Sequence, residues 1–173
     1  MNPFIKVTWS DVPENFTQEK IKRVKSYFQK KYDTTHVQVI TKTLNEGIAT
    51  FCHYWILNTM YDRGQLNDSQ MLEWLTSHTN VVFQPTYDDP RFTGINPYAL
   101  GFAIFKDLHR MCTNPTEEDM QWFPNLKGAD WKAVIRDAAT DYRDDSFISQ
   151  WLSPKVARDL KLFAITDNPD NSH

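Results

Sequence analysis

The sequence contains little glycine, few cysteines and no long apolar run. Its 173 residues include 5 Gly and 2 Cys. Cys52 and Cys112 have no paired spacing, which excludes a disulfide framework or a zinc ribbon and predicts a reducing, cytoplasmic location. The longest unbroken apolar run, Ala99 to Phe105, is far shorter than the ~20 residues of a membrane helix, and the first residues lack a secretory hydrophobic segment. We therefore expect no contact with a membrane.

The sequence also lacks a large excess of charge of one sign. The 19 basic residues nearly balance the 22 acidic ones, and the net charge is -3. This balance provides no general attraction to nucleic acid, which is therefore not an expected partner.

The chain is rich in large aromatic and apolar side chains. Aromatic residues make up 14% of it, hydrophobic residues 40% and charged residues 24%, which predicts a densely packed core. The length fits one domain. We expect an all-α fold of seven or eight helices over residues 1–166, followed by a flexible tail over residues 167–173.

Helical periodicity is clear over residues 36–63, 97–111 and 131–142, where apolar residues recur every three or four positions. Capping residues predict where several helices begin. Asn67 followed by Gln70 resembles a capping box, and three Asn-Pro or Ser-Pro pairs place a proline at the first helical position: Asn96-Pro97, Asn114-Pro115 and Ser153-Pro154.

A basic amphipathic helix is expected from Thr17 to Tyr32, with Ile21, Val24 and Phe28 on its apolar side. It could bind an acidic partner or RNA. We favour a solvated outer face, because basic residues beside a single apolar stripe usually face water.

One long ordered loop is expected over residues 77–96, which contain Pro85, Pro90 and Gly94 and show no helical period. Connections of this length are uncommon unless they serve a function. The candidate binding residues of this loop are Asn80, Tyr87, Asp89 and Arg91. In the alternative, Asn80 and Asp89 make turns and the aromatic residues pack.

Three residues are candidate metal ligands. Glu46 lies in a helix expected to be buried, where a carboxylate needs a partner. His53 shares its face seven residues later, although ~10.5 Å separates the two along the axis. His78 lies at the start of the expected loop. A structural interpretation is equally open. In it, Glu46 forms a hydrogen bond or ion pair in the core and His53 is a core histidine.

Other polar groups have simpler interpretations. His109 is expected to be structural. The acidic run Thr116-Glu117-Glu118-Asp119 resembles a metal cluster, but at a helix start we interpret it as capping. No Ser-His-Asp elbow and no phosphate-binding glycine loop is present.

Several strings resemble the stage V sporulation protein R family, in unbroken order over residues 41–166. They are Asn45-Glu46-Gly47-Ile48-Ala49-Thr50-Phe51-Cys52-His53-Tyr54, Ser77-His78-Thr79-Asn80-Val81-Val82-Phe83-Gln84-Pro85, Gly94-Ile95-Asn96-Pro97-Tyr98-Ala99-Leu100-Gly101-Phe102, Asn114-Pro115-Thr116-Glu117-Glu118-Asp119 and Leu152-Ser153-Pro154-Lys155. The family is named for a role in forming the spore cortex. The resemblance implies action with a serine kinase and a von Willebrand-type protein in stress or developmental responses.

The Asn-Glu-Gly-x-Ala string is also similar to the helix that supplies the glutamate ligand of gluzincin metallopeptidases. That similarity implies Zn²⁺ as a possible cofactor. Glu46 would be a zinc ligand, and His53 would be an additional ligand or a residue that contacts the ligands. Full-length family members carry a histidine-rich region upstream, which this chain lacks. It therefore resembles a shortened, central-to-C-terminal relative.

Two functions follow from these patterns. The first is a helical module of the cytoplasm that acts in sporulation or stress pathways by binding protein partners. The alternative is a zinc-dependent, hydrolase-like domain that uses Glu46, His53 and His78. The sequence specifies neither a reaction nor an oligomeric state.

Overall fold

The computed structural model describes Lys22 and residues 41–162, and helices are the only regular elements in this part of the chain. There are seven of them: α2 (Lys42–Asp62), α3 (Asp68–Val81), α4 (Pro97–Thr113), α5 (Glu117–Trp122), α6 (Trp131–Thr140), α7 (Asp144–Trp151) and α8 (Pro154–Asp159). The expected all-α class is confirmed, and the seven helices of the described part agree with the expected number.

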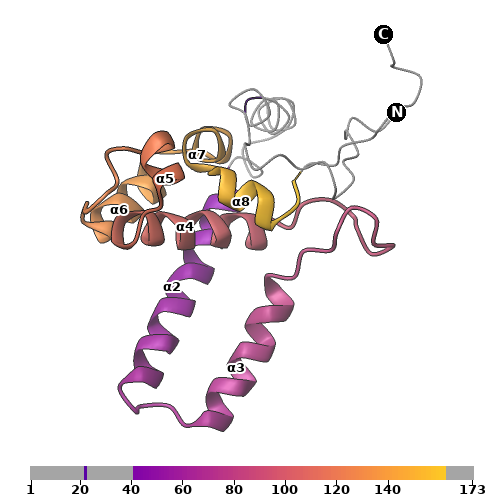
Figure 1. Cartoon of the computed structure of the whole chain (residues 1–173). Helices are drawn as coiled ribbons and strands as arrows, with labels where there is room; N and C mark the ends of the chain where they lie inside the picture. Colours follow the sequence, from indigo (N-terminus) through magenta and orange to yellow (C-terminus); the bar gives the residue numbers. More distant parts are fainter. Residues whose placement is uncertain (1–21, 23–40, 163–173) are drawn as a thin grey trace.

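The helices form a body and a projecting arm (Figure 1). Helices α4 to α8 and the first turns of α2 make up the body. We define the arm as residues 52–81, which comprise the rest of α2, the turn after it and α3. Helix α2 packs most extensively against α4, whereas α2 and α3 make few close backbone contacts. Side chains therefore fill the space between the two helices of the arm.

Two glycines allow α2 to cross α4 at backbone contact. A Cβ atom built on Gly47 would lie 2.5 Å from the Cα atom of Gly101, and one built on Gly101 would lie 2.1 Å from the Thr43 carbonyl oxygen. Real Cβ atoms essentially never come this close to another heavy atom. The crossing fixes where α2 leaves the body and thus the direction of the arm.

A buried carboxylate caps the start of α2. Asp144, the first residue of α7, is fully buried and accepts hydrogen bonds from the backbone N–H groups of Thr43 (2.8 Å) and Leu44 (2.7 Å). Burial raises the pKa of Asp144, although these two hydrogen bonds favour the ionised form. The cap satisfies two of the unpaired N–H groups of a helix start and joins α2 to α7.

The core lies around α4. Ile104, Phe105, Leu108 and Met111 have no exposed surface, and residues of α2, α6, α7 and α8 pack against the same cluster. Helix α4 is apolar on nearly all sides because it is surrounded by other helices, as its sequence predicts.

A partly buried ion-pair network attaches α5 and α8 to α4. Arg110 of α4 binds Asp119 through both terminal nitrogens, at 2.6 and 2.7 Å, and Asp107 through Nε at 2.7 Å. The Ser153 hydroxyl, which caps α8, donates to the other oxygen of Asp107 at 2.6 Å. Thr116 and Asp119 form a capping box at the start of α5, so the acidic run caps this helix as predicted.

The predicted helix starts at Asn67, Asn96 and Ser153 are confirmed, because each side chain accepts a backbone hydrogen bond there. The start predicted at Asn114-Pro115 is wrong by two residues. Asn114 instead ends α4, and α5 begins at Glu117 after the cap residue Thr116.

The long loop is shorter than predicted. Helix α3 continues through residues 77–81, and the Val82 N–H bonds to the His78 carbonyl to close its last turn. The loop therefore covers residues 82–96, and Asn80 is part of a helix.

No helix in the described part is both long and apolar enough to cross a membrane. Of the predicted basic helix, the structure describes only Lys22, which is helical and exposed. The predicted tail, residues 167–173, lies outside the described residues, as does the end of the predicted domain at residue 166.

Candidate functional site

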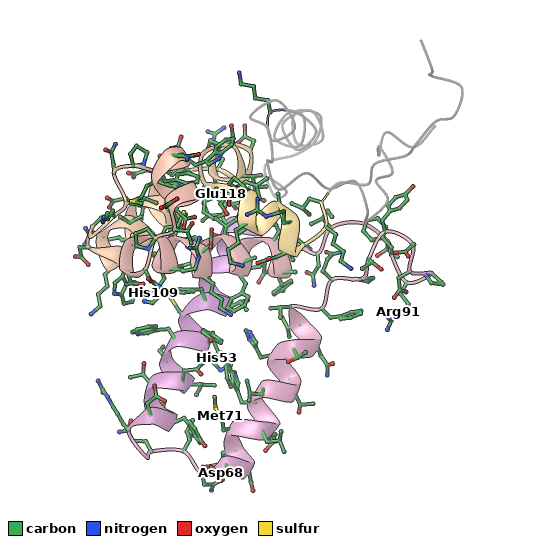
Figure 2. All side chains as sticks on the ribbon, in the orientation of Figure 1. His53, Asp68, Met71, Arg91, His109 and Glu118 are labelled. Atoms are coloured by element: carbon green, nitrogen blue, oxygen red, sulfur yellow. The ribbon has the colours of Figure 1, made fainter. Side chains whose placement is uncertain are left out.

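The candidate residues come from three neighbouring segments. Helix α2 carries Glu46 near the body and His53 on the arm, and α3 carries His78. The loop of residues 82–96 carries Tyr87, Asp89 and Arg91, and Figure 2 shows Arg91 on the outer part of this loop, away from His53 and the two helices of the arm.

Glu46 is half-buried and has a hydrogen-bond partner. The Tyr98 hydroxyl, at the start of α4, donates to its carboxylate, and this bond raises the pKa of Tyr98. Glu46 thus lies beside the glycine crossing and links α2 to α4. The sequence left two interpretations open for Glu46, a metal ligand or a structural hydrogen bond or ion pair. This contact is of the second kind.

His53 and His78 meet the same tryptophan inside the arm. The Trp74 ring centroid lies 5.9 Å from that of His53 and 5.1 Å from that of His78. Figure 2 shows His53 in the space between α2 and α3. His78 also contacts Tyr54 at 5.5 Å and Phe102 at 4.8 Å. The fold therefore brings together two of the three candidate ligands, which lie 25 positions apart in the chain.

The two histidines differ in environment. His53 is exposed, whereas His78 is only 9% exposed. Burial lowers the pKa of His78, and the nearby His53 and Lys106 lower it further. His78 is thus favoured in its neutral form, in which one ring nitrogen can accept a hydrogen bond or bind a metal.

The metal-binding set is incomplete in the described part of the chain. Among Lys22 and residues 41–162, no group of three His, Cys, Asp or Glu side chains could hold a metal ion. Glu46 does not join His53 and His78 in such a group. Because a catalytic zinc takes three protein ligands, these residues do not form a zinc site by themselves.

The loop of residues 82–96 is held closed at its base. The Gln84 side chain accepts a hydrogen bond from the Asn96 backbone N–H at 2.6 Å and donates to the Pro85 and Gly94 carbonyls at 3.0 and 3.3 Å. The Asn96 amide donates in turn to the Val81 carbonyl at 2.8 Å. These bonds join the two ends of the loop at its base.

An anchored arginine lies on the outer part of this loop. The Arg91 side chain is 69% exposed, and its Nε and Nη2 atoms bind Asp89 at 3.0 and 2.7 Å. Its guanidinium also lies 4.8 Å from the centroid of the Phe83 ring. Hydrogen bonds from Arg91 lower the pKa of Asp89 to about 2, which keeps this carboxylate charged. Tyr87 packs on Phe92 at 5.6 Å between ring centroids.

Sequence reasoning missed three residues of this region. They are Trp74, Phe83 and Gln84, none of which was singled out as a candidate site residue. Asn96 was recognised as a helix cap, but the pairing of its backbone N–H with Gln84 has no local sequence signal. His109 is structural as predicted, since it packs among Phe51, Trp55 and Trp131.

Comparison with known proteins identifies relatives of the chain. A family model described as SpoVR like protein matches residues 16–173. The YcgB protein of Escherichia coli (strain K12) is 50% identical over 153 residues, which cover 88% of this chain and 29% of that protein. The chain thus spans less than a third of the length of this relative. No solved structure matches.

Proposed function

Because the chain belongs to the SpoVR-like family and its body carries a closed outer loop, we propose that it is a helical module that binds another protein through this loop. The pathways that we propose are the sporulation and stress responses suggested by the family resemblance. The cytoplasm is the expected location, since the two cysteines show no disulfide pattern.

The observation that carries this proposal is the pairing of Arg91 with Phe83 on a loop that hydrogen bonds close at its base. Phe83 is 45% exposed although it is a large apolar side chain. Arginine and aromatic residues, including phenylalanine, are enriched at protein interfaces relative to the rest of the surface. Because Gln84 and Asn96 already order the loop, a partner would lose little free energy in fixing its conformation.

The proposed partners are the serine kinase and the von Willebrand-type protein implied by the family resemblance. Arg91 offers a guanidinium and Phe83 an apolar ring, so the matching surface would present a carboxylate next to an apolar side chain. Asp89 holds the guanidinium in place but also neutralises part of its charge, so we expect shape and apolar contact to contribute most of the affinity.

Surface plasmon resonance between the purified chain and each of these two proteins tests the proposal. We expect binding to at least one of them, and we expect Phe83→Ala and Arg91→Ala each to weaken it about tenfold or more. Arg136→Ala is the matched control, because its exposed pair with Asp137 lies on α6 of the body. Circular dichroism should show all three variants folded.

Two results contradict the proposal. One is a wild-type chain that binds neither protein. The other is binding that the loop variants leave unchanged, which would place the contact on another surface.

A second candidate function is the zinc-dependent, hydrolase-like domain. The observation that favours it is the meeting of His53 and His78 at Trp74. Since the described residues supply no third ligand beside them, a complete site needs one from elsewhere. Elemental mass spectrometry of the untagged protein tests this candidate. About one zinc per chain, lost in His78→Ala, supports it, and no metal in the folded wild type contradicts it.

A further inference from the structure

The arm contains a buried hydrogen-bond donor that has no acceptor. The Trp74 side chain is 8% exposed. Its Nε1 atom is buried and has no hydrogen-bond partner in the described part of the chain. An unpaired buried donor is costly to stability and uncommon in proteins, and a bound water molecule or ion is one explanation for it. The Trp74 N–H therefore indicates an acceptor that the described residues do not supply.

The polar side chains next to Trp74 are basic. The ring of His53, from α2, and the ring of His78, one turn further along α3, lie 5.9 and 5.1 Å from the Trp74 ring between centroids. Each imidazole carries at least one N–H donor. The groups whose charges act on His78 are His53 and Lys106, which both lower its pKa, and no carboxylate of the described residues is among them. Trp74 thus lies among donors and positive charge without a negative partner.

A third basic side chain approaches from α4. The Lys106 ammonium lies 5.2 Å from the centroid of the Tyr54 ring and 5.7 Å from that of the Phe102 ring. Both rings contact His78, at 5.5 and 4.8 Å between centroids. They hold the ammonium group by cation–π contacts but leave its charge in place. We name the four side chains with N–H donors that three helices bring together the donor cluster: His53, Trp74, His78 and Lys106.

The chemistry of the donor cluster selects an oxyanion. A water molecule would accept the Trp74 N–H but would leave the positive charge unbalanced. A metal cation cannot accept this hydrogen bond, and the Lys106 ammonium repels it. A phosphate group carries negative charge and enough oxygen atoms to accept from several donors at once, and hydrogen bonds to a charged acceptor are stronger than those between neutral groups. The aromatic rings around the cluster strengthen the attraction further, because they exclude water.

We propose that the donor cluster binds a phosphate group between α2, α3 and α4, with one phosphate oxygen accepting the Trp74 N–H. The N–H groups of His53 and His78 donate to the other oxygens, and the Lys106 ammonium balances the charge. The ligand is either free phosphate or the phosphate group of a small ester, since both present the same oxygens to the cluster.

The exposed member of the donor cluster is His53, which Figure 2 shows in the space between α2 and α3. Because these two helices make few close backbone contacts, rotation of the His53 side chain and a small separation of the helices admit the anion without unfolding the body. The cluster does not include the loop residues Phe83 and Arg91. The binding of phosphate and the proposed binding of a partner protein can therefore fail independently.

The indole N–H signals in the NMR spectrum of the nitrogen-15-labelled full chain test the proposal. The chain has six tryptophans, and Trp74→Phe identifies the Trp74 signal because it removes that N–H and keeps an aromatic ring. Titration of the wild type with sodium phosphate to about 20 mM, at an ionic strength held constant with sodium chloride, should shift the Trp74 signal until it saturates. Glycerol 3-phosphate is titrated in the same way, and the tighter of the two probes shows whether the site takes an ester or free phosphate.

Two lysine variants test the role of the charge. Lys106→Gln should weaken phosphate binding about tenfold or more, because it removes a charged donor. Lys132→Gln is the matched control and should bind like the wild type. The Lys132 ammonium lies 5.6 Å from the centroid of the Trp131 ring on α6, which is a contact of the same kind outside the donor cluster. Lys106→Gln should not weaken the binding of Zn²⁺, since loss of a positive charge favours a cation, and this separates the phosphate site from the zinc candidate.

Three results overturn the proposal. The first is a Trp74 signal that stays in place up to about 20 mM of both probes. The second is a shift that sodium chloride alone reproduces, which would reflect ionic strength. The third is a Lys106→Gln variant that binds phosphate as tightly as the wild type. Lys106 and Lys132 are both exposed, so circular dichroism should show both variants folded.

Discussion

At the scale of single residues, the close approach of α2 to α4 depends on having no side chain at Gly101. A Cβ atom there would lie 2.1 Å from the Thr43 carbonyl oxygen, and backbone on both sides prevents relief by a rotamer change. We predict that Gly101→Ala lowers the free energy of unfolding by about 3 kcal/mol or more. Urea denaturation followed by circular dichroism measures this change.

The control for that prediction is Gly64→Ala. Gly64 has φ +69° and no other atom within 4 Å of a built Cβ, so only backbone strain opposes the substitution. We expect a loss of about 1 kcal/mol, the usual cost of a left-handed conformation for alanine. If both variants lose the same amount, close packing of the helices is not what requires Gly101.

A second residue-scale prediction concerns Asp119. Burial alone would raise its pKa, but hydrogen bonds from Arg110 and Thr116 outweigh burial and lower the pKa to about 2 from the ordinary 3.8. Because the folded pKa is the lower one, the stabilisation is present above about pH 4 and is lost as the pH falls to about 2. The expected contribution is about 2 kcal/mol.

Urea unfolding between pH 2 and pH 6 measures this loss. Asp119→Asn should be less stable than the wild type at pH 6 and should show a shallower decline of stability below pH 4. Asp89→Asn is the control, because its pair with Arg91 lies on the surface, where water screens the interaction. If the free energy of unfolding depends on pH in the same way in the wild type and in Asp119→Asn, the stabilising role assigned to the Asp119 carboxylate is contradicted.

At the scale of elements, local sequence signals predicted the helices and most of their starts. Asn67, Asn96 and Ser153 are recognisable because a helix cap is formed by residues close in the chain. The end of α3 could not be predicted in this way. Polar residues 77–80 look like a loop, but the helix persists because His78 packs between Trp74 and Phe102, which is a tertiary contact.

The loop of residues 82–96 is predicted to depend on one side chain. Gln84→Ala removes the acceptor of the Asn96 N–H and the donor to the Gly94 carbonyl. We expect the body to keep its thermal midpoint within a few degrees, while trypsin cleaves after Arg91 at least several times faster than in the wild type. Limited proteolysis followed by mass spectrometry measures the rate. Arg91 is exposed in both proteins, so an unchanged rate would show that Gln84 does not order the loop.

At the scale of the whole molecule, the sequence supplied the candidate residues but not their grouping. Glu46 and His53 share a helix face by spacing alone, yet Glu46 bonds to Tyr98, and His53 meets His78 through Trp74. The grouping of these residues depends on how α3 packs beside α2 and on where α2 crosses α4. Neither arrangement is encoded in a local sequence pattern. Family resemblance was readable because it rests on contiguous strings.

The division into body and arm predicts two levels of local stability. Ile104, Phe105, Leu108 and Met111 of α4 are fully buried at the centre, so its amides should exchange with solvent only through global unfolding. Leu72 is 66% exposed, and α3 makes few close contacts with α2, so amides near the tip of the arm should exchange through local opening. We expect exchange there to be at least about 100-fold faster than in α4. Hydrogen–deuterium exchange mass spectrometry measures both regions in one sample. Equal protection of arm and α4 would mean that the arm unfolds only together with the body.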